Sequence, residues 1–380
     1  MRSAVVAGHI CLDIIPAVGH HFDLTPGRLY EVGAATLCTG GAVSNTGVSL
    51  SILGIPTRLA GKIGDDTFGR AVAAILERYG AGLSAGLITD PQAVTSYTVV
   101  VNIPGVDRIF LHCPGANHTF GEADIVPSAY GEAALFHFGY PTLMGQTYAE
   151  DGRQLEAIFR KVKCAGLTTS LDMTMPDPSG PSGRANWQAI LRRTLPHTDV
   201  FLPSADELLY MIDRDRFGQG DNLSGEALTQ IGARLLGMGV AVAGVKLGAR
   251  GLYLRTGSVA RMRATGRTAP ADPAAWANRE LWFPIYHTDQ VAGTTGAGDA
   301  TIAGFLAALL RDAGIEECGN FANAVGACNV QAPDALSGIL SWEETQARLA
   351  RGWPRGPLDV VGPGWRRDDA TGIWHGPAEG

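Results

Sequence analysis

The sequence has few charged residues and no long uninterrupted hydrophobic run. Charged side chains make up 18% of the 380 residues, below the usual value of about 25%, and the formal net charge is −7. This acidic balance argues against general nucleic-acid binding. The apolar N-terminal stretch is broken by His9, Asp13 and Pro16, so it falls short of the ~18 apolar residues of a membrane span. The parts of a signal peptide are also missing, and we expect a soluble, cytoplasmic protein with no membrane partner.

The six cysteines are scattered, with no Cys-x-x-Cys pair and no neighbouring histidine cluster. This arrangement argues against a zinc site or a disulfide framework, and small buried apolar residues are their expected role. Glycine, in contrast, is abundant, with 50 residues where an average of about 7% would give roughly half as many. Many backbone positions are therefore expected to be tight.

Strand-like apolar runs alternate with amphipathic helical runs along most of the chain. Apolar residues recur at helical spacing over 68–79 and 155–162, while 168–173 and 240–247 are typical of buried strands. This alternation predicts parallel βαβ units in an α/β protein.

One region departs from the alternation. Two apolar runs within 95–115, separated by a turn at Pro104 and Gly105, predict a β-hairpin. Together with residues of about 13–40, the hairpin is expected to form a small antiparallel sheet that projects from the main body as a lid.

The composition of the chain predicts a main domain, an insertion within it and a C-terminal tail. Residues 1–350 are predicted to form the main domain. Within it, 256–285 is rich in Ala, Arg, Thr and Pro with weak periodicity and is interpreted as an insertion between two core elements. Residues 351–380 hold three tryptophans among Gly and Pro and form a tail, which either packs on the body or extends an interface.

The strongest chemical signal is a glycine-rich turn within 291–304 that opens directly into an apolar helix. Glycines let the backbone N–H groups of Gly296, Ala297 and Gly298 converge, and a helix N-terminus adds about half a positive charge, which favours an anion. Asp299 in the first turn is placed to accept a proton from a hydroxyl. The alternative is an ordinary tight turn with Asp299 stabilising the helix start.

A glycine pair, Gly40 and Gly41, precedes a second helix that contains Asn45 near its start. The glycines permit close approach of the backbone to a ligand, and Asn45 offers both a donor and an acceptor to hydroxyl groups. A helix cap is the alternative role for Asn45.

Two further segments are compatible with a nucleotide. Gly248 and Gly251 follow a buried strand, where they allow either a close pass to phosphates or a hairpin turn. Glu207 lies in the first turn of a helix after a strand, where it either compensates the helix dipole or holds a metal-bound water.

These segments, in this order, resemble the ribokinase-like family of carbohydrate kinases, the phosphofructokinase B type. GGxxxN at 40–45 is similar to the N-terminal signature of that family and TTGAGD at 294–299 to its C-terminal signature, within a resemblance that runs from Ala4 to about Leu349. The resemblance implies a three-layer α/β/α fold with a mainly parallel central sheet and a β-sheet lid. It also implies that a sugar-like alcohol binds beneath the lid, with ATP beside it.

The resemblance implies roles for the matching residues. Asp299 is the implied general base, and the backbone of Gly296, Ala297 and Gly298 the implied anion hole. Glu207 is expected to act with Mg²⁺ through water. The implied substrate residues are Asp13, Gly40, Gly41 and Asn45, and the implied nucleotide residues are Ser204, Lys246, Gly248, Gly251, Gly298 and Asn323.

Aromatic and polar residues of the hairpin and of nearby loops are further candidates for the sugar pocket. Phe110 and His112 are the candidates on the hairpin, where core or ordinary lid positions are the alternatives. Asn117 and Tyr140 are weaker candidates, and Asp172 at a strand end faces the nucleotide or is structural.

Three positions depart from the family pattern. Gly293 stands where Asp is common, which argues against a monovalent-cation site. Ser204 replaces a common Asn, and Lys246 replaces a common Thr. The lysine side chain either reaches a phosphate or lies in solvent at the end of a strand.

The predicted function is that of an ATP-dependent sugar kinase. A nucleoside kinase is the closest alternative, and a non-catalytic sugar or nucleotide sensor on the same scaffold is the alternative from another class. Lids of this type often pair between subunits in the family, so a homodimer is expected.

Overall fold

The computed structural model describes residues 1–19, 25–103 and 109–379. The predicted turn at Pro104 and Gly105 lies outside the described residues.

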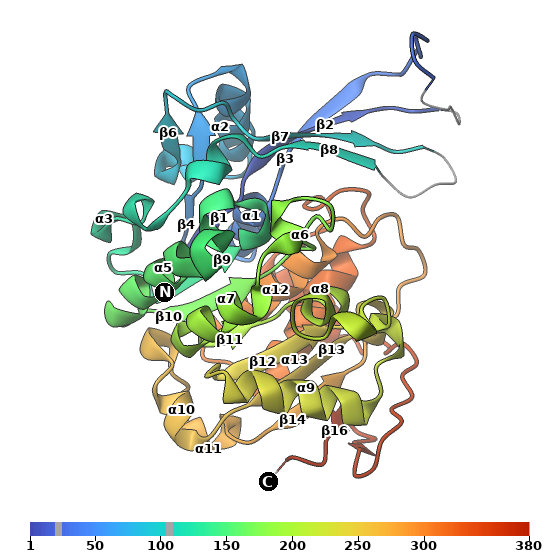
Figure 1. Ribbon diagram of the computed structural model, residues 1–380. Coiled ribbons are helices and arrows are strands. Elements are labelled where there is room, and N and C mark those ends of the chain that lie inside the picture. The colour runs from blue at the N-terminus through green and yellow to red at the C-terminus, as the bar shows by residue number, and fades with distance from the viewer. Residues whose placement is uncertain (20–24, 104–108, 380) are drawn as a thin grey trace.

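A central sheet runs through the molecule, and its strands are parallel from β4 to β12 (Figure 1). From one edge to the other, its order is β4 (Thr57–Ala60), β1 (Ala4–Gly8), β9 (Leu135–Gly139), β10 (Thr168–Asp172), β11 (Val200–Phe201), β12 (Val242–Lys246), β13 (Leu252–Thr256), β14 (Glu280–Phe283), β16 (Trp374–His375) and β15 (Arg366–Arg367). The last four strands are antiparallel to their neighbours.

Helices cover both faces of this sheet, because successive side chains of a strand point to opposite faces. Val6 of β1 packs in one core cluster and Val5 in the other. One layer holds α1 (Ala42–Ile52), α2 (Thr67–Tyr79), α12 (Ala297–Leu310), α13 (Ile315–Asn329) and α14 (Trp342–Ala350), and the other α5 (Arg153–Cys164), α7 (Trp187–Thr194), α8 (Ala205–Ile212) and α9 (Gly225–Gly237). The predicted α/β/α fold is confirmed.

Shorter elements connect these layers. The short helices are α3 (Pro127–Tyr130), α4 (Gly145–Tyr148), α6 (Pro181–Arg184), α10 (Val259–Arg263) and α11 (Pro273–Trp276), and β5 (Lys62–Gly64) pairs with β6 (Ile88–Asp90). None of the helices among the described residues has the length and apolar character needed to cross a bilayer.

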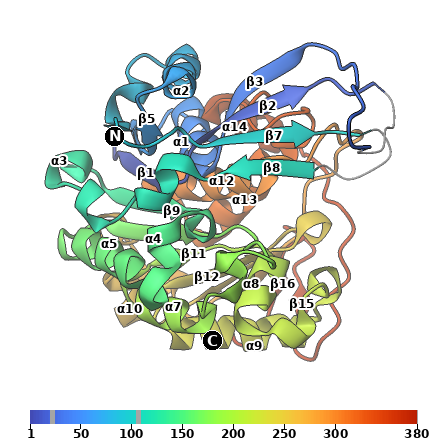
Figure 2. The same cartoon turned by 45° about the horizontal axis from the view of Figure 1, so that its top comes forward.

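The small separate sheet projects from one end of the body as a lid (Figure 2). Its order is β3 (Ala35–Gly40), β2 (Cys11–Pro16), β7 (Tyr97–Val101) and β8 (Ile109–Cys113). The predicted hairpin is the antiparallel pair of β7 and β8. The expectation of a purely antiparallel sheet is wrong, because β2 and β7 pair in parallel.

The register gives the lid two different faces. Cys38, Asp13, Thr98 and His112 are neighbours across the four strands and share one face, which we call the polar row. The preceding or following residue of each strand lies on the opposite face. These residues are Leu37, Ile14, Val99 and Leu111, which we call the apolar row.

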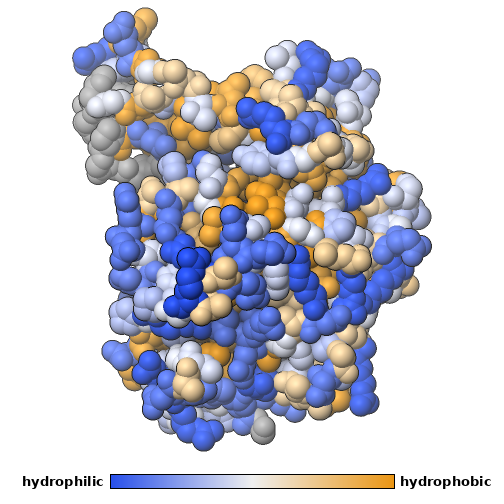
Figure 3. All heavy atoms as spheres, turned by 180° about the vertical axis from the view of Figure 1, so that it is seen from behind, coloured by the Kyte–Doolittle hydropathy of each residue, from blue (hydrophilic) through white to orange (hydrophobic). Residues whose placement is uncertain are grey.

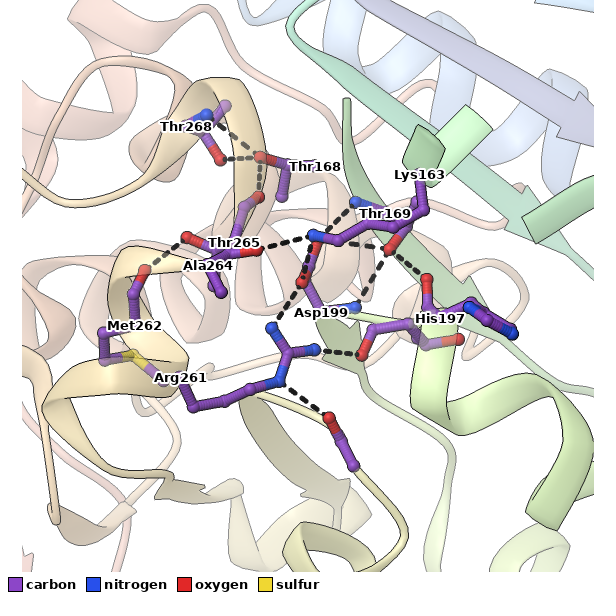
Figure 4. Close-up of polar contacts among 12 residues, drawn as sticks. Lys163, Thr168, Thr169, His197, Asp199, Arg261, Met262, Ala264, Thr265 and Thr268 are labelled. Carbon is purple, nitrogen blue, oxygen red and sulfur yellow. Dashed lines mark hydrogen bonds and ion pairs between the residues drawn. The ribbon is translucent and has the colours of Figure 1, made fainter. Parts of the chain in front are cut away.

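The expected insertion at 256–285 extends too far, because it includes β14, a buried strand of the central sheet. This strand has only four residues, and Glu280 interrupts its apolar pattern. The rest of the segment is anchored to the body by Arg261, whose guanidinium donates to Asp199 at 2.8 Å and to the carbonyl of Thr198 at 3.0 Å (Figure 4).

Residues 351–380 pack against the body. Strands β16 and β15 extend the edge of the sheet beyond β14, and the ring of Trp365 lies 5.9 Å from that of Trp282. Trp353 stacks on Tyr286 with a centroid distance of 4.9 Å. The tail therefore supports the chain segment that follows β14.

Candidate active site

A cavity of about 490 Å³ lies where the carboxyl ends of β9 to β12 meet the N-terminus of α12. Ligands of open α/β sheets commonly bind at this edge. Each of these strands places a polar residue at or just beyond its end, and the residues are Tyr140, Asp172, Ser204 and Lys246. The two predicted nucleotide residues Ser204 and Lys246 thus lie in one cavity.

Asp299 lies buried in the first turn of α12, with 2% of its surface exposed. Its Oδ2 accepts hydrogen bonds from the Asn45 amide at 3.0 Å and the Tyr140 hydroxyl at 2.7 Å, and its Oδ1 accepts one from Thr46 at 3.1 Å. The two predicted signatures therefore meet at this carboxylate. Asn45 is not the helix cap, because α1 begins after Gly41.

The glycine turn before α12 has the geometry that requires glycine. Gly296 has φ of +75°, and a Cβ there would lie 2.5 Å from Cβ of Ala335. The N–H group of Ala297 already donates to the carbonyl of Thr294 at 3.2 Å. Of the three predicted anion-hole donors, Ala297 is thus bonded within the turn itself.

Lys246 brings a positive charge to this turn. Its Nζ lies 3.2 Å from the place where a Cβ of Gly298 would stand, and 2.8 Å from Oδ1 of Asp172. Burial disfavours the charged lysine, but Asp172 and Glu207 outweigh this effect and raise the pKa of Lys246 above its ordinary value. The cavity therefore holds a persistent cation beside the anion-binding turn. The solvated strand end considered for Lys246 is excluded by its burial.

Glu207 also lines the cavity, and one of its oxygens accepts a hydrogen bond from the N–H group of Ser204 at 2.8 Å. This hydrogen bond is part of a capping box at the start of α8, which the sequence interpretation of Glu207 did not include, and the carboxylate still lines the cavity wall. Burial raises the pKa of Glu207, and the positive charge of Lys246 opposes this rise.

The remaining predicted nucleotide residues lie at the far end of the cavity. Gly248 and Gly251 adopt φ of +55° and +89° in the turn between β12 and β13. The Asn323 amide donates to the carbonyls of Phe283 and Pro284, so it shapes the wall formed by the chain after β14.

The predicted substrate residues lie on the lid side of Asp299. Asp13 and His112 share the polar row and are linked through Thr98, whose hydroxyl lies 3.0 Å from Nδ1 of His112. Phe110 lies on the same face as His112, but it is 56% exposed and does not line the cavity at Asp299. Burial raises the pKa of Asp13 to about 6.

The glycine pair makes room for two polar side chains. A Cβ on Gly40 would lie 2.3 Å from Oδ2 of Asp13, and a Cβ on Gly41 would lie 2.5 Å from Nδ1 of His9. Gly41 also has φ of +87°. Larger residues at these positions would displace Asp13 or His9.

Two sequence candidates have different surroundings from those expected. The Asn117 side chain is bonded to the backbone of Ile10 at 2.8 and 3.2 Å, which makes it structural. Tyr140, a weak candidate from the sequence, instead donates directly to Asp299. Its backbone has φ of +63°, a conformation that is uncommon for residues other than glycine.

Sequence reasoning missed Thr46 and His9 altogether. Thr46 follows Asn45 in α1. Polar residues on the buried face of this helix are a sequence signal that could have identified Thr46. His9 interrupts an apolar run before Asp13. The sequence analysis uses this interruption only as evidence against a membrane span.

The sequence of this chain is similar to those of known carbohydrate kinases. Residues 1–342 match the model of the pfkB family of carbohydrate kinases. A probable fructokinase-7 of Arabidopsis thaliana is 27% identical over 356 residues, which covers 91% of this chain and 92% of that protein. A fructokinase of Vibrio alginolyticus is 28% identical over 323 residues, covering 83% and 91%.

Solved structures have the same fold. A ribokinase of Arabidopsis thaliana complexed with ribose and ATP has a TM-score of 0.71 at 21% identity, covering 92% of this chain and 98% of that chain. A putative ribokinase II of E. coli in complex with ATP and Mg²⁺ has a TM-score of 0.69 at 20% identity, covering 92% and 100%. The chain belongs to the pfkB family. It is a carbohydrate kinase, an ATP-binding phosphotransferase with the ribokinase-like fold.

Proposed function

We propose that this kinase transfers the γ-phosphoryl group of ATP to a hydroxyl of a small carbohydrate, with Asp299 as the general base. The observation that supports this most directly is the position of Asp299. Asp299 follows the glycine turn directly, in the first turn of α12, and hydrogen bonds from Asn45, Thr46 and Tyr140 orient its carboxylate.

In the proposed reaction, Asp299 accepts the proton of the attacking hydroxyl as its oxygen forms a bond to the γ-phosphorus. The bond from that phosphorus to the bridging oxygen breaks, and ADP leaves. The N–H groups of Gly296 and Gly298 and the ammonium of Lys246 face the charge of the transferring group, where donors fixed in advance are effective. Asp172 holds Lys246 in place until the phosphates compete for it.

The residues of the cavity are compatible with Mg²⁺ bound mainly through phosphates and water. Among residues 1–19, 25–103 and 109–379, no group of three His, Cys, Asp or Glu side chains could hold a metal alone. Mg²⁺ beside a nucleotide needs only one or two carboxylates. Glu207 at the cavity wall would supply such a carboxylate, and the ion would neutralise charge on the phosphates. With Gly293 at the usual Asp position, we propose no monovalent-cation site.

The test is ADP release with Mg²⁺ and ATP across pentoses, hexoses, sugar acids and nucleosides, with D-fructose first because fructokinases are among the relatives. Wild-type protein is expected to respond to a sugar, and Asp299→Asn to lose that response. A response only to nucleosides would favour the nucleoside kinase. Sugar binding without any ADP release would favour the sensor.

We also propose that the apolar row of the lid pairs with a second copy of the chain. Leu37 and Leu111 of this row are 48% and 58% exposed, and Figure 3 shows hydrophobic side chains gathered over the lid. Exposed apolar patches of this kind are typical of interfaces. Light scattering is expected to report a dimer for the wild type and a monomer for Leu111→Glu. A wild-type monomer would contradict the proposal.

A further inference from the structure

His9 lies on the same side of the site as the predicted substrate residues. The family resemblance gives its imidazole no role. His9 follows β1 and is 2% exposed. Neither of its ring nitrogens has a hydrogen-bond partner among the described residues. A buried unpaired donor or acceptor is unfavourable, and most native structures avoid it. The unpaired imidazole of His9 therefore indicates that a bound ligand supplies its hydrogen-bond partner.

The surroundings of His9 place it between the catalytic carboxylate and the lid. Its ring centroid lies 5.2 Å from that of His112 in the polar row and 6.3 Å from that of Tyr140, which is bonded to Asp299. Gly41 leaves the space beside Nδ1 of His9. His9 thus belongs to the path from the lid to the base.

A second unpaired acceptor lies near this path. The side-chain oxygen of Asn45 is buried without a partner among the described residues, although its amide nitrogen donates to Asp299. A neutral imidazole carries one donor and one acceptor, and a hydroxyl group can satisfy either. His9 and Asn45 together therefore match a molecule with several hydroxyl groups.

The charges of this region disfavour an anion. The pKa of His9 is lowered well below its ordinary value, first by burial and then by His112 and His118, so its ring is neutral. Asp13 is the carboxylate of the polar row, and its pKa is set by burial and by hydrogen bonds from Cys11 and Thr98. Among the described residues, no lysine or arginine forms an ion pair with Asp13, whose side-chain partner is the Cys11 thiol. A carboxylate or phosphate on the acceptor would thus face Asp13 without a compensating cation.

We propose that His9 binds a hydroxyl of the phosphoryl acceptor, and that His9, Asn45 and Asp13 together select an uncharged polyhydroxy sugar over sugar acids and sugar phosphates. This inference rests on the proposed kinase function. The sugar reaches His9 when the polar row moves away from the body, because the rings of His9 and His112 contact each other in this structure.

The charge preference is tested with matched pairs that differ only in one oxidised carbon. The pairs are D-fructose and 2-keto-D-gluconate, D-glucose and D-glucuronate, and D-galactose and D-galacturonate, in which both members keep the carbonyl that closes the ring. The neutral member of the productive pair is expected to have kcat/KM at least 100-fold higher. A sugar acid with the higher kcat/KM would overturn the inference while leaving the kinase function intact. No ADP release with any compound would overturn the kinase function and this inference with it.

The role of His9 is tested with His9→Ala, His9→Gln and a matched control, His137→Asn. His137 is also a fully buried histidine, but only its Nε2 lacks a partner among the described residues, because its Nδ1 lies 3.0 Å from the hydroxyl of Ser170 on the neighbouring strand. His9→Ala is expected to raise KM for the preferred neutral sugar at least tenfold and to leave KM for ATP within twofold. His9→Gln should restore part of the affinity, and the control should leave KM for the sugar unchanged.

A measurement on the wild type avoids reliance on folding of the variants. The side-chain ¹⁵N signals of His9, assigned by their absence in His9→Gln, are expected to shift when the preferred neutral sugar is added without nucleotide. The signals of His137 should not move. Unchanged His9 signals at saturating sugar, or an unchanged KM in folded His9→Ala, would overturn the role of His9.

Discussion

Two clusters of buried charge lie at opposite ends of the parallel strands, and they differ in how completely the carboxylate is satisfied. At the amino end of β11, Asp199 accepts hydrogen bonds on both oxygens from Lys163, with others from Arg261 and Thr169 (Figure 4). This cluster joins α5, β10 and the start of α10. Its charges are fully used in holding those elements together.

At the carboxyl end of the same strands, the charges are only partly paired. Among the described residues, Lys246 forms an ion pair with one carboxylate, that of Asp172, and the carboxylates of Glu207 and Asp299 line the same cavity without an ion pair to a cation. Burial raises the pKa of Asp172 despite the nearby lysine. An arrangement that leaves buried carboxylates without matching cations costs stability, and such sites are typical of catalysis. The comparison teaches that saturation of the carboxylates by cations, rather than burial, separates the structural cluster from the candidate active site.

The largest expected effect is on catalysis at the unsaturated end. Asp299→Asn removes the proposed base, and a general base contributes about 10²- to 10⁴-fold to a rate, so kcat should fall by about 10³-fold. The unfolding temperature should not decrease, because a buried negative charge is removed. Steady-state kinetics and thermal unfolding of the same preparation check both parts. A kcat within tenfold of the wild type would contradict the assignment of Asp299.

The opposite pattern is expected at the saturated end. Asp199→Asn leaves Lys163 and Arg261 without their carboxylate. Breaking a buried ion pair lowers the free energy of unfolding by roughly 3 kcal/mol or more. We expect a loss near this lower value, because both cations are partly exposed. Urea unfolding measures this loss. The kcat of the folded fraction should remain that of the wild type. If kcat fell with stability unchanged, the structural role of Asp199 would be wrong.

Asp13 is expected to affect both the stability of the protein and the binding of the sugar. Its pKa in the folded protein is about 6, above the ordinary value of 3.8, because it is buried. The folded state therefore binds this proton more tightly than the unfolded state, and stability is lost as pH rises from about 4 to about 6. Asp13→Asn should raise the free energy of unfolding at pH 7 by up to roughly 3 kcal/mol, since one pKa unit corresponds to about 1.4 kcal/mol.

The same substitution should weaken sugar binding, because the amide replaces a pure acceptor with a group that also donates. In the wild type, KM for the sugar should rise as pH falls below 6, where Asp13 becomes protonated. Unfolding curves and KM values at pH 5 to 8 check these expectations. A pH-independent stability difference between wild type and variant would contradict the raised pKa of Asp13.

The parts of the site that the sequence predicted are those encoded by local patterns. The turn before α12 and the glycine pair before α1 each carry their glycines and their polar residue within a few positions. The α/β class was predicted for the same reason, because βαβ units repeat a local periodicity. The lid hairpin was recognised from two adjacent runs, whereas the parallel pairing of β2 with β7 joins distant segments.

The contacts that the sequence did not predict join residues that are far apart in the chain. Asp172 and Lys246 are 74 positions apart, and Tyr140 and Asp299 are 159 apart. Nothing near Tyr140 in the sequence specifies that its hydroxyl will reach α12, because that depends on how β9 and α12 are placed by the core. Strand β14 was missed for a different reason, since four residues are too few to show a period.

Tyr140 gives the smallest expected effect and the finest test of the unsaturated cluster. Tyr140→Phe removes one of three hydrogen bonds to Asp299. A hydrogen bond to a charged group contributes about 1.5–3 kcal/mol, and with Asn45 and Thr46 still in place kcat should fall by roughly tenfold or less. Because the phenylalanine ring still fills the same space, KM for the sugar and for ATP should stay within about twofold of the wild type, and steady-state kinetics check both parts.

The matched control is Tyr148→Phe, since that tyrosine lies against Trp187 and away from Asp299. Its kcat and KM values should equal those of the wild type. Tyr140 adopts φ of +63°, and the cost of this conformation is retained in the phenylalanine variant, so the backbone strain itself does not change between the two proteins. An unchanged kcat in Tyr140→Phe would therefore assign Tyr140 to packing of the cavity wall, whereas a fall in kcat that Tyr148→Phe does not share would assign its hydroxyl to the orientation of the base.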